Sequence, residues 1–157
     1  MGREATLVLI KPDAIQRKLI GVVLSRLEPL DVKLIGAKAV RVDRALAEAH
    51  YQPLRGKPFF DELIRYLCGE LHGVDFVLAL VFWGEEAIRQ IRDVVGATNP
   101  EAAAPDTIRG AYGCLAGGGR MENILHASSD ESEATREIAL WFHPEELLIQ
   151  PLPLRRG

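Results

Sequence analysis

Hydrophobic residues recur along the chain at two spacings, and each spacing predicts one kind of secondary structure. Four short runs, in which apolar residues are continuous or alternate with polar ones, are typical of β-strands: 5–10, 32–42, 74–82 and 123–126. Between these runs, apolar residues recur every three or four positions, which is typical of helices with one buried face. The helical stretches are 20–27, 43–50, 57–67, 85–95 and 128–142.

The order of these elements, β-α-β-α-α-β-α-β-α, predicts the fold class. Two strand–helix–strand units in succession indicate an α/β (α+β) fold of the ferredoxin-like type, with a four-stranded antiparallel sheet and helices packed on one face. Segments rich in glycine, proline and loop residues are expected to connect the elements, at 68–75, 96–105 and 110–119. No linker-like tract divides the 157 residues, so we expect a single domain spanning 1–157.

Composition and charge exclude several classes of protein. Hydrophobic residues make up 48% of the chain, which is enough to build a core. The net charge of −3 argues against a dedicated nucleic-acid surface, and the longest apolar stretch, 74–83, is too short to span a membrane. Cys68 and Cys114 fit neither a metal-binding spacing nor a disulfide framework. These features favour a cytoplasmic protein.

One histidine, in "NILHASSD", is a candidate for chemistry. His126 ends a predicted strand, where a histidine is more often a hydrogen-bonded core residue than a catalyst. Glu137 lies three residues after Ala134 and four before Trp141, so it faces the apolar side of the last helix and needs a partner. Two alternatives stay open. Glu137 accepts a hydrogen bond from His126 and leaves the other imidazole nitrogen nucleophilic, or it pairs with a surface lysine or arginine.

Positive side chains follow strands and helices in positions where they could bind an anion. Lys11 comes directly after the first strand, Arg92 is near the end of a helix, and Arg109 lies in "PDTIRG". A guanidinium group matches two phosphate oxygens at once, although each such group alone is more often a solvated charge. The glycines at 117–119 do not form a Walker loop, because no Gly-Lys-Ser/Thr follows them.

Five separated segments carry a resemblance to a known family. They occur in order from near the first residue to about Leu147: "TLVLIKPDAIQRKLIG", "HYQPLRGKPFFDELIRY", "GATNPEAAAPDTIRG", "NILHASSD" and "EIALWFHPEEL". On these segments the chain resembles the nucleoside diphosphate kinases. The resemblance implies a ping-pong phosphotransferase, in which His126 takes the γ-phosphate of ATP or another nucleoside triphosphate and gives it to a nucleoside diphosphate.

The resemblance also implies roles for individual residues. Catalysis would involve His126, Glu137, Lys11 and Ser128. Nucleotide binding would involve Lys11, Tyr51, Phe59, Leu63, Arg92, Thr98, Arg109 and Asn123. Phe59 would stack on the base and Leu63 would border it. From the residues alone, the preferred interpretations are core packing beside Phe60 for Phe59 and a surface position at a helix end for Tyr51.

The family resemblance implies a metal and an assembly as well. Mg²⁺ would arrive with the nucleotide and be held by phosphates and water, so no metal-ligating residues are expected in the chain. The family usually forms hexamers or tetramers, which predicts a homo-oligomer.

The chain departs from the family pattern at several positions. Ala111 stands where an aspartate is usual, and the histidine motif has Ala127 and Ser129 in place of glycine and aspartate. The segments 68–75 and 110–122 are longer than usual. Alanine tolerates fewer backbone conformations than glycine, so the effect of Ala127 depends on its backbone angles.

Two other functions remain as alternatives. A catalytically silent relative would bind nucleotide or a partner without forming a phosphoenzyme. A ligand sensor or structural module on the same fold would have no reactive histidine, because fold alone does not determine function. Phosphoenzyme formation separates the first alternative from an enzyme, and a rise in melting temperature with ADP and Mg²⁺ separates the second.

Overall fold

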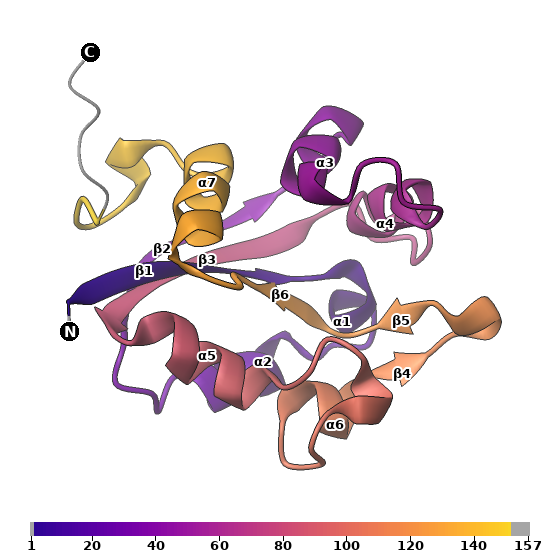
Figure 1. The fold of residues 1–157 in the computed structure, drawn as a ribbon, viewed down its shortest axis with the longest axis horizontal. Helices are drawn as coiled ribbons and strands as arrows, with labels where there is room; N and C mark the ends of the chain where they lie inside the picture. The colour runs from indigo at the N-terminus through magenta and orange to yellow at the C-terminus, as the bar shows by residue number, and fades with distance from the viewer. Residues whose placement is uncertain (1, 152–157) are drawn as a thin grey trace.

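The computed structural model describes residues 2–151, and its centre is a four-stranded antiparallel sheet (Figure 1). The strands lie in the order β2-β3-β1-β6, and their bounds are β1 Arg3–Ile10, β2 Lys33–Val40, β3 Val77–Glu85 and β6 Leu125–Ala127. β1 pairs with β3 along its whole length and with β6 at its end, where Leu9 lies opposite His126. The predicted fold class and the four predicted strands are therefore confirmed.

Helices cover both faces of this sheet, so the prediction that they lie on one face was wrong. One core contains Leu7 and Leu9, and a second core on the other face contains Val8 and Ile10. A strand that is buried on both sides shows a continuous apolar run, and residues 7–10 of β1 form one. The prediction of one covered face came from the order of the elements and did not use this run.

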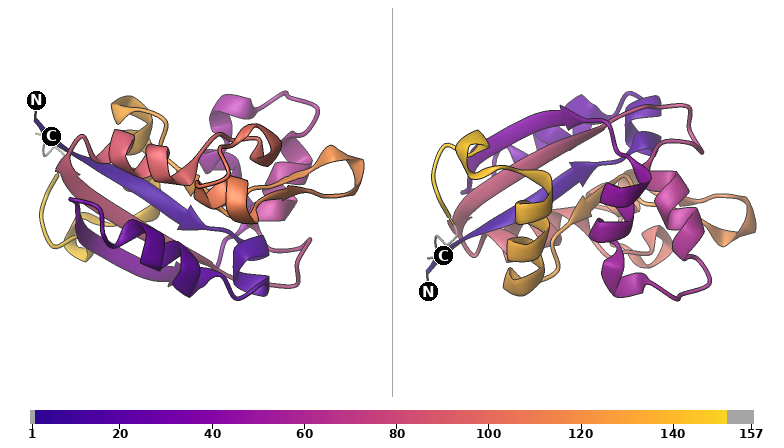
Figure 2. Two further views of the ribbon diagram at one scale, coloured as in Figure 1. Left: turned by 90° about the horizontal axis from the view of Figure 1, so that it is seen from below. Right: turned by 90° about the horizontal axis from the view of Figure 1, so that it is seen from above.

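Each face has its own set of helices (Figures 1 and 2). The Leu7 face is covered by α3 Arg44–His50, α4 Phe60–Leu67 and α7 Glu131–Trp141. The Val8 face is covered by α2 Ile20–Leu27, α5 Ala87–Val95 and α6 Ile108–Tyr112. Among the residues described, no helix is long and apolar enough to cross a membrane.

Aspartate side chains begin two of the predicted helices. Asp43 accepts a hydrogen bond from the backbone N–H of Leu46 at 2.8 Å, and Asp130 accepts one from Glu133 at 2.8 Å. Such caps satisfy N–H groups that have no partner inside the helix. Asp130 is the N-cap residue of α7, so this helix begins at Glu131, three residues later than the predicted stretch 128–142.

Several short elements were not predicted. Residues 12–16 form α1 (Pro12–Gln16), and the expected loop from residue 110 begins inside α6. The same segment continues as a hairpin of two-residue strands, β4 Cys114–Leu115 and β5 Met121–Glu122. Elements of two to five residues are too short to show a hydrophobic period. Short 3-10 turns complete the described chain: η1 Gln52–Leu54, η2 Pro100–Ala102, η3 Gly117–Gly119 and η4 Pro144–Glu146.

Candidate active site

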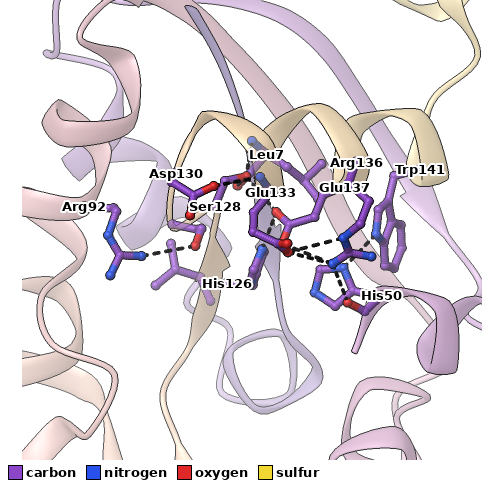
Figure 3. Close-up of polar contacts among 12 residues, drawn as sticks. Leu7, His50, Arg92, His126, Ser128, Asp130, Glu133, Arg136, Glu137 and Trp141 are labelled. Carbon is purple, nitrogen blue, oxygen red and sulfur yellow. Dashed lines mark hydrogen bonds and ion pairs between the residues drawn. The ribbon is translucent and has the colours of Figure 1, made fainter. Parts of the chain in front are cut away.

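His126 and Glu137 are directly hydrogen-bonded. The Nε2 atom of His126, on β6, lies 2.8 Å from Oε1 of Glu137, on α7 (Figure 3). The carboxylate can only accept, so Nε2 carries the proton and Nδ1 keeps a free lone pair. The alternative of a surface cation is secondary, because the nearest guanidinium, of Arg136, lies 4.0 Å from the other carboxylate oxygen.

Ser128 holds the same oxygen of the Glu137 carboxylate. Its hydroxyl donates to Oε1 of Glu137 at 2.7 Å and accepts from the backbone N–H of Leu7 at 3.0 Å. The serine is fully buried between β1 and α7. Glu137 therefore has a fixed orientation, and it transmits that orientation to the imidazole of His126.

Burial sets the charge state of the histidine. Burial first, and then the charges of Lys11, Arg109, Arg92 and Arg136, lower the pKa of His126 well below its usual value. The imidazole is consequently neutral near pH 7, with one unprotonated nitrogen. Burial also raises the pKa of Glu137, against which the Ser128 hydroxyl stabilises the ionised form.

A cavity of about 660 Å³ opens in front of His126. Its volume is in the range of pockets that enclose a small organic ligand. The cavity brings together all of the predicted site residues except the buried Ser128, which lies behind Glu137. Those on its wall are Lys11, Tyr51, Phe59, Leu63, Arg92, Thr98, Arg109, Asn123, His126 and Glu137.

Lys11 and Asn123 form a hydrogen-bonded pair in this cavity. The Lys11 ammonium donates to Oδ1 of Asn123 at 2.9 Å, and the Asn123 amide donates to the carbonyl of Thr98 at 3.0 Å. Burial, followed by the charge of Arg109, lowers the pKa of Lys11 to about 7, although Asp13 opposes the shift. No carboxylate of the described residues forms an ion pair with this buried ammonium, which makes it a ready partner for an anion.

Arg109 is held by backbone carbonyls. Its guanidinium donates to Asn123 at 3.2 Å, to Gly96 at 3.1 Å and to Leu125 at 2.7 Å. Burial, with the charge of Arg92 next, lowers the pKa of Arg109 to about 10, which still leaves it charged at pH 7. The side chain therefore has a fixed position, and none of the described residues provides it with a counter-ion.

The chain between β5 and β6 is strained beside the site. Ile124 has a φ of 73°, which a β-branched residue adopts only where its surroundings require it. Its N–H donates to Oδ2 of the buried Asp13 at 3.1 Å, and its carbonyl accepts from the N–H of Lys11 at 2.9 Å. The hydroxyl of Tyr66 bonds the other oxygen of Asp13. These contacts fix the positions of the neighbouring Asn123 and Lys11.

Phe59 does not pack in the core, and Tyr51 does not lie on the surface, so both interpretations from the residues alone were wrong. Phe59 is 47% exposed and faces the cavity, so it does not pack in the core with Phe60. Tyr51 is buried rather than on the surface, and its hydroxyl has no hydrogen-bond partner among the described residues. Both side chains are thus available to a ligand.

Sequence reasoning missed a second histidine in the site. The ring of His50 packs edge-to-face against that of His126, with the two ring centroids 4.5 Å apart. Its Nδ1 atom accepts a hydrogen bond from the Trp141 indole at 3.1 Å. Arg136 donates to the carbonyls of Ala49 and His50, each at 2.9 Å. No sequence spacing relates the end of α3 to α7, so this contact could be found only in three dimensions.

Within residues 2–151, one group of side chains could hold a metal ion. Donor atoms of His50, His126 and Glu137 lie within 4.8 Å of one another. The surrounding cationic side chains disfavour an unaccompanied cation at this position and favour an anion.

Comparison with known proteins identifies the family. The family model described as nucleoside diphosphate kinase matches residues 4–147. The chain belongs to the nucleoside diphosphate kinase family.

Similar sequences and structures agree with this assignment. A nucleoside diphosphate kinase of Pyrococcus furiosus is 46% identical over 92% of this chain and 86% of its own length. One of Staphylococcus epidermidis is 44% identical over 92% and 91%. A transition-state mimic of the Borrelia burgdorferi enzyme with bound vanadate and ADP superposes with a TM-score of 0.84, at 33% identity, over 96% of this chain and 94% of that one. The Halobacterium salinarum enzyme in complex with CDP has a TM-score of 0.83 at 40% identity, over 97% and 95%.

The departures from the family pattern have little effect on the backbone of the site. Ala127 is not among the described residues with positive φ, so its position does not require a glycine. Asp130 supplies the helix cap, and Ser129 is exposed on the cavity wall. Ala111 is exposed on α6. Members of this family are nucleotide-binding phosphotransferases, a class that generally uses a divalent metal.

Proposed function

We propose that this chain is a nucleoside diphosphate kinase that transfers the γ-phosphate of a nucleoside triphosphate to a nucleoside diphosphate through a phosphohistidine on His126. The observation that carries the proposal is the hydrogen bond from Nε2 of His126 to Glu137, which leaves Nδ1 unprotonated in front of a cavity of about 660 Å³. A free imidazole nitrogen held by a fixed partner is an activated nucleophile.

The reaction consists of two related displacements. The Nδ1 lone pair attacks the γ-phosphorus, a nitrogen–phosphorus bond forms, and the bond from phosphorus to the bridging oxygen breaks, so this oxygen leaves on the nucleoside diphosphate. No proton has to be removed from His126 first. Glu137 accepts the Nε2 hydrogen bond throughout and stabilises the positive charge that develops on the ring. In the second step a terminal β-phosphate oxygen of the acceptor attacks, and His126 leaves.

Cationic side chains bind the phosphates. Lys11, Arg92 and Arg109 line the cavity and would offset the negative charge that gathers on the transferred group. Tyr51, Thr98 and Asn123 offer hydrogen-bonding groups between these cations and the nucleotide. Phe59 would stack on the base, with Leu63 at its border, and stacking accepts any base because each has a π-face.

We propose Mg²⁺ as the divalent metal, bound through the nucleotide phosphates. The chemistry of the cavity wall fits this mode of binding, because its basic residues suit phosphates and its carboxylates already have partners. Glu137 is bonded to His126 and Ser128, Glu133 pairs with Arg136, and Glu62 pairs with Arg120. Mg²⁺ commonly binds through substrate phosphates and water, and it neutralises phosphate charge.

We also propose a homo-oligomer, a tetramer or a hexamer. Support comes from large apolar side chains that are exposed on the described chain, including Leu34 on the edge strand β2 and Leu148 after η4. Exposed apolar surface of this kind is typical of subunit contacts. A molar mass by light scattering of four or six times that of the chain is expected, and a monomer would contradict it. A cytoplasmic location, expected from the short apolar stretches and the cysteine content of the sequence, stays a prediction.

Phosphoenzyme formation tests the proposed function. Purified protein is incubated with γ-labelled ATP and Mg²⁺, freed of nucleotide, and assayed for label that is acid-labile and base-stable. We expect label on the wild type, transfer of that label to added GDP, and no label on His126→Ala. His143→Ala, which changes an exposed histidine, is the matched control and should be labelled normally. A folded wild type that binds ADP but takes up no label would favour the catalytically silent alternative.

A further inference from the structure

The two segments that are longer than the family pattern contact each other. His72, in residues 68–75, has its Nε2 atom 2.6 Å from Oε1 of Glu122, on β5. Both side chains are largely buried, with 6% and 15% of their surface exposed. The Gln16 side chain, on α1, donates to the His72 carbonyl at 2.8 Å, which fixes the position of the loop 68–75. The β4–β5 hairpin is therefore held in place by the other long segment.

This contact continues to Arg120, between η3 and β5. Oε1 of Glu122 also accepts a hydrogen bond from Arg120 at 3.0 Å. Although burial opposes the shift, hydrogen bonds from Arg120 and His72 lower the pKa of Glu122, so this carboxylate is ionised. The other terminal nitrogen of Arg120 lies 3.5 Å from Oε1 of Glu62, on α4. The arginine thus bridges the hairpin and α4.

Arg120 and Glu62 lie at the end of the cavity where the base is expected. Both line the cavity together with Phe59 and Leu63. Their ion pair is long and partly exposed, with 26% and 48% of the two side chains accessible, so its loss costs little free energy. A guanidinium has five N–H donors, and only two contacts to carboxylates occupy them. Both side chains can therefore bind a ligand.

The chemistry of this pair selects among the bases. Guanidinium donors bind the O6 and N7 acceptors of guanine, and a carboxylate accepts from its N1–H and N2 amino groups. Adenine has an amino group at position 6, which would meet the guanidinium donor to donor. Of the two purines, guanine satisfies Arg120 and Glu62 together.

We propose that Arg120 and Glu62 are specificity-determining residues that favour guanine nucleotides, and that Glu122 and His72 are positioning residues for Arg120. This inference rests on the proposed function, since it concerns the nucleotide that enters the same cavity. On this inference the two longer segments, 68–75 and 110–122, act together to position Arg120 beside the nucleotide base.

Single-turnover discharge of the phosphoenzyme tests the pair. The enzyme is phosphorylated with ATP, freed of nucleotide, and mixed with GDP, IDP or ADP, and the second-order rate of label loss is measured. We expect GDP to discharge the wild type about tenfold faster than ADP, the size of one good base contact. IDP, which lacks only the N2 amino group, should lie between them.

Four variants assign the contacts. Arg120→Lys should lower the GDP rate about tenfold and leave the ADP rate unchanged. Lysine keeps the positive charge but lacks the planar guanidinium, whose two N–H groups bind O6 and N7 of guanine together. Glu62→Gln should lower the GDP rate more than the IDP rate, because GDP loses the contact to its N2 amino group as well as the N1–H contact that IDP shares. Glu122→Gln should reduce the GDP-to-ADP ratio through loss of Arg120 positioning, without changing the ADP rate. Arg89→Ala removes a cation from the exposed face of α5, outside this cavity, and should behave as wild type.

The outcomes separate this inference from the proposed function. Equal discharge by GDP and ADP, or an Arg120→Lys effect that is the same for both, would overturn the base-recognition pair while the phosphoenzyme itself still stands. Absence of any phosphoenzyme would instead remove the proposed function. Normal phosphorylation of each variant by ATP shows that the variant is folded.

Discussion

The Nε2 atom of His126 lies 2.8 Å from the carboxylate of Glu137, and the hydroxyl of Ser128 lies 2.7 Å from the same carboxylate oxygen. This chain of hydrogen bonds runs from the backbone of β1, through Ser128 and Glu137, to the imidazole. It determines which nitrogen carries the proton, and so which nitrogen is available to phosphorus.

Glu137→Gln should slow phosphorylation of His126 by about tenfold to a hundredfold, because a charge-assisted hydrogen bond is replaced by a neutral one. Ser128→Ala should have a smaller effect, since it removes a neutral donor that acts only through Glu137. Rapid-quench measurement of label uptake from ATP gives both rates. Equal effects of the two substitutions would contradict the order of contacts described above.

Lys11 should make nucleotide binding weaker as the pH rises above 7. Burial holds its pKa at about 7 in the free protein, so the ammonium is increasingly deprotonated as the pH rises above 7. Phosphate charge raises the pKa again when nucleotide binds, so binding takes up protons above pH 7 and weakens as the pH rises.

Calorimetric titration of ADP with Mg²⁺ in two buffers of different ionisation enthalpy measures this proton uptake. At pH 8 we expect an uptake of a large fraction of one proton in the wild type and a much smaller one in Lys11→Gln. Proton release at pH 8, or an uptake that survives Lys11→Gln, would show that another group is responsible.

Asp13 should contribute to stability more than to chemistry. It is buried and accepts hydrogen bonds from the Tyr66 hydroxyl and from the N–H of the strained Ile124. Asp13→Asn should lower the free energy of unfolding by about 1–3 kcal/mol, because one of these donors is left without a good acceptor. Urea denaturation measures the change. Asp31→Asn, at an exposed turn, is the control and should change stability little.

Replacing Ala127 by the glycine that is usual in the histidine motif should increase neither the stability of the protein nor its rate of phosphorylation. Ala127 has no positive φ, so Ala127→Gly only increases the freedom of the unfolded chain and should cost about 0.4–1 kcal/mol of stability. The rate of phosphoenzyme formation should remain within about twofold of the wild type, a difference of less than RT. A faster variant would indicate that the alanine methyl group obstructs the site.

The sequence predicted β1, β2, β3 and the long helices because their hydrophobic patterns extend over six or more residues, and it predicted β6 from the short apolar run that ends at His126. The continuous apolar run at 7–10 of β1 is typical of a strand covered on both faces, but the prediction of one covered face was taken from the order of the elements and did not use that run. The hairpin at Cys114–Glu122 was missed because its strands have two residues each. Likewise, His50 and Arg120 reach the cavity only through tertiary contacts with Trp141 and Glu122.

The position of the phosphoryl group on the imidazole tests the central claim most directly. Labelled phosphoenzyme is hydrolysed in alkali, and the two phosphohistidine isomers are separated by chromatography against standards. Because Glu137 holds Nε2, the label is predicted to be found on Nδ1 of His126. Label on Nε2 would contradict the account, since that nitrogen would have to leave Glu137 before it could attack.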